Sequence, residues 1–85
     1  MRLAKFVKLR EEKFGGVLFE TKSEKVFTLT TSAAAIVREI NLGGGDEAAV
    51  AARLKSQFDA RDGDAIEREV KVFVADLRQR GLVED

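Results

Sequence analysis

The stretch that decides the fold is "KVFTLTTSAAAIVREI", residues 25–40, because the spacing of its apolar residues changes partway along it. The first five residues alternate between two faces, as a strand does, with Val26 and Thr28 on one face and Phe27 and Leu29 on the other. Apolar residues then recur at helical spacing. A threonine at the junction is a good helix N-cap, since its hydroxyl accepts a free amide hydrogen of the first turn. The stretch therefore predicts a strand that leads directly into a helix.

Two earlier runs predict further strands. "KFVKL" (5–9) has a weak strand pattern, and "GVLFE" (16–20) is rich in aromatic and β-branched residues. The polar segment "TKSEK" has hairpin length and joins the second run to the third. Gly15 and Gly16 allow the backbone to bend where the chain enters the second strand. We expect three antiparallel strands at the N-terminal end.

Three helices are expected after the strands. The glycine run at 43–45 ends the first, and Asp46 is a suitable N-cap for the second. The third runs to about Arg80, with a capping box expected at Asp64 and a Schellman motif at Gly81. Its main apolar stripe consists of Ile66, Val70, Phe73 and Leu77. The whole is an α+β domain, winged helix-turn-helix-like, with three N-terminal antiparallel strands followed by three helices.

Length and composition limit the classes of function. The 85 residues make a single domain, 1–85, and 45% hydrophobic with 35% charged residues is typical of a globular chain. Neither cysteine nor histidine is present, which removes thiol nucleophiles and the usual zinc ligands. The acidic residues belong to helix caps and charged faces, and "DARDGD" (59–64) lacks calcium-loop spacing. We expect no catalytic residue, no metal and no cofactor, and therefore no enzyme.

Charge and hydropathy bear on location and partners. Lys and Arg together equal Asp and Glu, 15 each, and the two signs are interleaved, so no basic stripe for nucleic acid is visible. The apolar runs are much shorter than a membrane span, and no signal peptide is readable, which favours the cytoplasm and no membrane partner. A winged-helix DNA-binding transcriptional regulator is the alternative, with the third helix as reader, although its acidic residues would repel phosphates.

The third strand is the most informative element for function. An edge strand has unpaired backbone groups, to which an extended peptide can add as a further strand. The flank of the third helix would then wall the groove, and Val72 leaves apolar surface outside the helix's main stripe. Alternatively, the edge is protected by Lys22, Lys25 and the twist of the hairpin, or by the N-terminal strand. A second copy of the chain could also pair there, giving a homodimer.

In this order and spacing, "LREEKFGG" (9–16), "VFTLTTSAA" (26–34) and "LRQRGLVE" (77–84) resemble the PqqD family. These are small peptide chaperones, or recognition elements, of pyrroloquinoline quinone and related modified-peptide biosynthesis. The resemblance covers Phe6 to Glu84. The sequence has "LTTSA" where the family commonly has "LNPTA", so the resemblance does not specify the pyrroloquinoline quinone pathway itself.

The resemblance implies that the domain binds the leader of a ribosomally made precursor peptide. It would present the leader to a modifying enzyme, often a radical S-adenosylmethionine maturase. The leader would lie along the strand at 25–29 and against the third helix, at roughly Glu67–Arg78. On this basis Val74→Asp is expected to weaken leader binding while the domain stays folded. The peptide-binding residues so implied are Lys25, Val26, Phe27, Thr28, Leu29, Glu67, Lys71, Val74 and Arg78.

Overall fold

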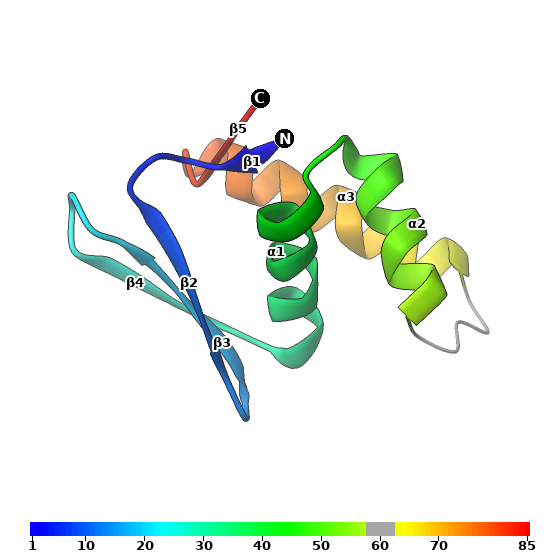
Figure 1. Ribbon diagram of the computed structural model, residues 1–85, viewed down its shortest axis with the longest axis horizontal. Coiled ribbons are helices and arrows are strands. Elements are labelled where there is room, and N and C mark those ends of the chain that lie inside the picture. Colours follow the sequence, from blue (N-terminus) through cyan, green and yellow to red (C-terminus); the bar gives the residue numbers. More distant parts are fainter. Residues whose placement is uncertain (58–62) are drawn as a thin grey trace.

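The computed structural model describes residues 1–57 and 63–85, with the side chains of 63 and 64 outside the description. It confirms an α+β chain in which an antiparallel sheet precedes three helices (Figure 1). The elements are β1 (Arg2–Leu3), β2 (Val7–Glu12), β3 (Gly15–Glu20), β4 (Lys25–Leu29), α1 (Thr31–Gly43), α2 (Glu47–Gln57), α3 (Gly63–Gln79) and β5 (Val83–Glu84). The expected capping box at Asp64 lies outside the described residues, as do residues 58–62.

The three-stranded sheet has the order β2-β3-β4, and both pairings are antiparallel. Leu18 at the centre of β3 lies opposite Phe27 of β4 and is fully buried, whereas Phe19 lies opposite Val26 and both are exposed. The sheet therefore has one face against the helices and one open face, as the alternation in β4 predicts.

The junction between β4 and α1 forms as the sequence predicts. Thr30 has extended backbone angles, and its hydroxyl accepts a hydrogen bond from the Ala33 amide at 3.2 Å. The start of β3 lies against this junction. A Cβ at Gly15 would lie 2.3 Å from the carbonyl oxygen of Leu29, and the residue has a φ of 143°, so only glycine fits here.

The other helix ends also follow the expected chemistry. Asp46 caps α2 by accepting a hydrogen bond from the Ala49 amide at 2.9 Å. At the end of α3 the Leu82 amide donates to the Leu77 carbonyl at 2.9 Å, and the Gly81 amide donates to the Arg78 carbonyl at 3.0 Å. With Gly81 at a φ of 73°, these two bonds form a Schellman motif. Of the described helices, none is both long and apolar enough for a membrane span.

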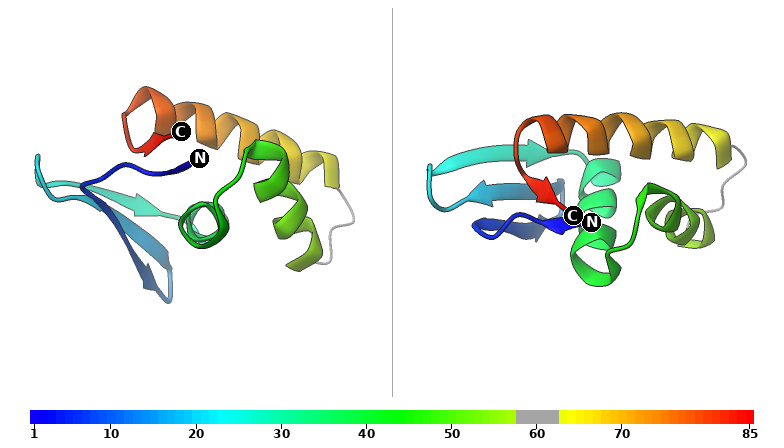
Figure 2. Two further views of the ribbon diagram at one scale, coloured as in Figure 1. Left: turned by 45° about the horizontal axis from the view of Figure 1, so that its top comes forward. Right: turned by 90° about the horizontal axis from the view of Figure 1, so that it is seen from above.

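A second, two-stranded sheet was not predicted. β1 pairs with β5 antiparallel, joining the two ends of the chain. The Ala4 amide adds a bond of 2.9 Å to the Leu82 carbonyl, and an ion pair of 3.0 Å joins Arg2 to Glu84. Figure 2 shows the termini side by side. Because the Schellman turn reverses the chain after α3, β5 lies beside the helix and completes the core through Val83.

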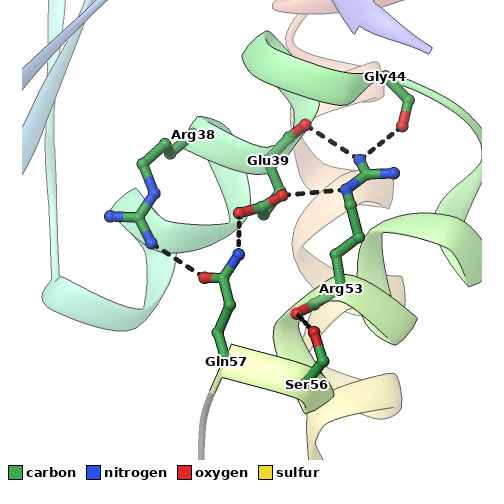
Figure 3. Close-up of polar contacts among 6 residues, drawn as sticks. All are labelled: Arg38, Glu39, Gly44, Arg53, Ser56 and Gln57. Atoms are coloured by element: carbon green, nitrogen blue, oxygen red, sulfur yellow. Dashed lines mark hydrogen bonds and ion pairs between the residues drawn. The ribbon is translucent and has the colours of Figure 1, made fainter.

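The core lies between the sheet's inner face and the helices, and α1 supplies its centre, with Val37 and Ile40 almost fully buried. The one buried charged residue in the described part is Glu39, 5% exposed. It accepts hydrogen bonds from Gln57 and, at 3.0 Å, from Arg53, both on α2 (Figure 3). Arg53 also donates to the carbonyl of Gly44 at 2.7 Å. This network fixes α2 on α1 and satisfies a carboxylate that burial would otherwise penalise.

Candidate binding groove

β4 is the free edge of the three-stranded sheet. It pairs with β3 along one side, and no strand in residues 1–57 and 63–85 pairs with the other. In the same described residues, no backbone hydrogen bond outside the regular helices and strands involves residues 25–29. β2, the first strand of this sheet, occupies the opposite edge, so it does not protect β4. A row of outward N–H and C=O groups is therefore available to another extended chain.

The groove beside this edge is formed by β4, the start of α1 and one stripe of α3. It has a volume of about 560 Å³. Four α3 residues on one side of the helix line one wall, and the other wall comes from the end of β4 and the first turn of α1. The lining residues are Thr28, Leu29, Thr30, Ala33, Glu69, Val72, Phe73 and Asp76.

The groove has an apolar floor and a polar rim. Leu29 and Phe73 pack with the core, and Val72 stands at the rim with 70% of its surface exposed. Beyond the lined stretch, the Arg80 guanidinium lies 5.4 Å from the centre of the Phe27 ring and forms an ion pair of 3.1 Å with Asp76. An apolar floor next to free backbone groups is suited to a peptide strand with alternating side chains.

The five residues predicted on β4 lie on this edge, but they divide between the two faces of the sheet. Phe27 and Leu29 face the helices, with Phe27 half-buried and Leu29 buried. Val26 and Thr28 are exposed on the open face, although Thr28 also reaches the rim of the groove. Lys25 is exposed at the start of the strand.

Three of the predicted α3 residues do not face β4. Glu67 forms an ion pair with Lys55 of α2, and Lys71 lines a separate groove between α2 and α3. Arg78 forms an ion pair of 2.9 Å with Asp85, which lowers the pKa of that carboxyl group, chiefly through the hydrogen bond between them. These three side chains therefore belong to the flanks of α3 that meet α2 and the C-terminus.

The prediction for Val74 needs correction. Its side chain is fully buried, between the core positions Val70 and Leu77, so it cannot contact a peptide while the domain stays folded. The spacing already contained the signal: Val74 follows Val70 by four residues and precedes Leu77 by three, which places it in the buried stripe. The α3 residues that line the groove beside β4 are Glu69, Val72, Phe73 and Asp76, one or two positions from the predicted ones.

The chemistry of the groove is that of binding. Its titratable residues are Glu69 and Asp76, and in the described residues no group of three or more histidine, cysteine, aspartate or glutamate side chains could hold a metal ion. The hydroxyls of Thr28 and Thr30 and the backbone of β4 offer hydrogen bonds, and the floor offers apolar contact. This combination is suited to contacts with an extended chain.

Several solved structures are similar to this fold along nearly the whole chain. A lasso peptide synthetase B1 complexed with the leader peptide is 27% identical, with a TM-score of 0.77, covering 99% of this chain and 96% of that one. TbiB1 in complex with the TbiA(beta) leader peptide is 18% identical, with a TM-score of 0.79 and coverage of 99% and 95%. SuiB of Streptococcus suis has a TM-score of 0.51 at 14% identity, and the match covers 93% of this chain but 21% of SuiB.

The similarities to TbiB1 and SuiB show the fold alone, because the sequence identities are low. The comparison with curated proteins gave no match. The family model described as coenzyme PQQ synthesis protein D matches residues 15–83, from the start of β3 to β5. The matched span contains β4, the groove and the whole of α3. The chain therefore belongs to the PqqD family.

Proposed function

We propose that this domain binds the leader segment of a ribosomally synthesised precursor peptide and presents it to a modifying enzyme. The observation that carries the proposal is the unpaired outer edge of β4 beside an apolar-floored groove on α3. The similarity to a lasso peptide synthetase B1 complexed with the leader peptide supports it.

The mechanism would be strand addition. Backbone groups of the leader pair with those of β4, which places alternate leader side chains over the groove floor at Leu29 and Phe73. The remaining side chains lie on the open face beside Val26 and Thr28. Affinity would come from the strand's hydrogen bonds and from apolar anchors in the floor, since exposed ion pairs contribute at most about 1 kcal/mol each.

Two similarities suggest which enzyme receives the leader, and they suggest different ones. The family resemblance suggests a radical S-adenosylmethionine maturase. The similarity to the lasso peptide synthetase B1, which spans nearly all of both chains, favours a lasso-type synthetase instead. Pull-down of the domain with the modifying enzymes encoded beside its gene, with and without leader peptide, distinguishes the two.

The leader-binding proposal is tested by amide NMR titration. The probes are synthetic peptides covering the short reading frames that flank the gene. We expect shifts concentrated on Lys25–Leu29 and on the α3 residues Glu69, Val72, Phe73 and Asp76. Shifts confined to Lys55 and Lys71 in the α2–α3 groove would place the peptide elsewhere, and no response to any of the peptides would overturn leader binding.

A further inference from the structure

The charges around the groove differ in whether they already have a partner. Asp76 is ion-paired with Arg80 at 3.1 Å. Lys25 lies opposite Glu20 in the β3–β4 register. The pKa of Glu20 is lowered mainly by a hydrogen bond from Ser23, and Lys25 adds to that effect through its charge. Asp76 and Arg80 therefore compensate each other, and Lys25 lies opposite an acidic residue of β3.

Glu69 differs from them. Its side chain lines the groove, is exposed, and has no ion pair or hydrogen bond from any side chain in residues 1–57 and 63–85. Because Asp76 is neutralised by Arg80, Glu69 is the uncompensated charge among the described lining residues. Arg80 lies over the Phe27 ring. Glu69 on α3 comes about three helical turns before Arg80, so it lies toward the other end of the groove, where Thr30 and Ala33 follow β4.

The start of α1 is the other electrostatic feature at this end of the groove. A helix N-terminus carries a partial positive charge of about half a unit. Here the Thr30 hydroxyl already accepts a hydrogen bond from the Ala33 amide at 3.2 Å, so one of the free amide groups that produce this charge has a partner. The Glu69 carboxylate carries a full negative charge, which is larger than this partial positive charge.

The surroundings of Glu69 fit a long cationic side chain. Val72 is one helical turn away and leaves 70% of its surface exposed at the rim. A lysine or arginine that reached Glu69 would lay its methylene stem over this apolar surface while its charged head stayed in water. A leader residue paired opposite Leu29 lies on the same sheet face as Leu29, which is the groove side.

We propose that Glu69 and Val72 form a cation subsite that selects leader peptides with lysine or arginine at the position facing α3 beside Leu29. The inference rests on the proposed leader binding and adds a sequence preference to it. The subsite also fixes register, because a slip of one residue turns the cation toward the open face of the sheet.

The test uses a display library of random peptides of about twelve residues, long enough to span β4 and both its ends. It is selected on the wild-type domain, on Glu69→Lys and on Glu67→Lys. The two variants make the same change in net charge on the same helix, but Glu67 faces α2. We expect enrichment of lysine and arginine on wild type and Glu67→Lys, and of aspartate and glutamate on Glu69→Lys.

A selected peptide then supports a double-mutant cycle. Replacing its cation by glutamine, or Glu69 by glutamine, is expected to weaken binding about three- to fivefold, and the two changes together should weaken it little further. Added salt should reduce the difference. Glu69→Gln changes no core contact, so the cycle remains available if the lysine variant folds poorly.

The two proposals fail differently. If no library peptide binds at β4, leader binding itself is wrong. If peptides bind there but carry no excess of lysine or arginine, and Glu69→Gln leaves their affinity unchanged, the cation subsite is wrong and leader binding stands.

Discussion

At the scale of single residues, neighbouring positions on α3 have opposite roles. Val74 is fully buried, whereas Val72 is 70% exposed at the groove rim. Glu39 shows the same point for charge, because it is buried but its carboxylate is fully engaged by α2. In each case the contacts of the side chain, rather than its type, determine what a substitution does.

The two valines make a matched pair of substitutions. Val74→Asp places a charge in the core and should cost roughly 3 kcal/mol or more, a large part of the total stability of a domain of this size. Val72→Asp should leave the thermal midpoint nearly unchanged and weaken a bound peptide, because it replaces apolar groove surface with charge. Circular dichroism melts and calorimetric titration measure both effects. A Val74→Asp variant that melts at the wild-type midpoint would contradict the assignment of its side chain to the core.

Glu39 gives a prediction about pH. Its pKa is lowered, first by the hydrogen bond from Gln57 and then by Arg53, so the folded state favours the charged form. The stability that it contributes is present above the ordinary pKa of a glutamate and is lost as the pH falls through the lower folded-state value. Glu39→Gln should cost about 1.5–3 kcal/mol at neutral pH and flatten the acid limb of a denaturation profile.

The control for this prediction is Glu11→Gln. That residue pairs with Arg38 on the exposed surface at 3.4 Å, so its loss should change stability by less than about 1 kcal/mol. Equal acid sensitivity in wild type and Glu39→Gln would show that the carboxylate contributes no pH-dependent stability.

At the scale of elements, local sequence patterns predict the structure correctly where a single segment determines its own conformation. The change from strand to helix at Thr30 and the Schellman turn at Gly81 both follow from short stretches, and both are confirmed. The flank of α3 that faces β4 could not be predicted, because its apolar period identifies the buried stripe but not which neighbour each flank meets. The β1–β5 pairing joins residues at opposite ends of the chain, and two-residue strands leave no pattern.

The edge of β4 makes a prediction about backbone chemistry. In a strand added to β4, alternate peptide amides point toward the sheet and the others point away. Two versions of a bound peptide are N-methylated at every second residue, one at the odd positions and one at the even positions. One version should lose binding, and the other should bind nearly as well as the unmethylated peptide. Fluorescence anisotropy with the two methylated series measures this. Equal loss in both series would rule out strand addition as the binding mode.

Because the edge of β4 is free, homodimer formation through this edge also remains a prediction. Two copies could pair through β4, and such a dimer would compete with the peptide for the same backbone groups. Sedimentation velocity at several protein concentrations detects self-association, and peptide in excess should reverse it.

At the scale of the whole molecule, the small size of the domain couples its stability to binding. A chain of 85 residues buries a modest fraction of its surface, so its own stability margin is small. A peptide that binds the folded state alone stabilises it by about 2.7 kcal/mol at a concentration of a hundred times Kd. For a domain of this size the thermal midpoint should rise by about 10–20 °C. Scanning calorimetry with and without peptide measures the shift, and an unchanged midpoint under saturating peptide would contradict binding to the native fold.

The net charge of the chain also bears on the DNA-binding alternative. The outward flanks of α3 carry Glu67, Glu69 and Asp76 among their basic residues, and the whole chain is neutral. A DNA-recognition helix needs an excess of basic side chains to displace counterions from the phosphates. The surface of α3 therefore favours a peptide partner over a duplex.

The pairing of β1 with β5 has a consequence for how the domain can be rearranged. Since the first and last strands are hydrogen-bonded neighbours, a short glycine-serine bridge from Asp85 to Met1 would close the backbone into a ring with little strain. New ends could then be opened in the hairpin turn between β3 and β4, giving a circular permutant. A host protein could likewise carry the module as an insertion, held at a single attachment point.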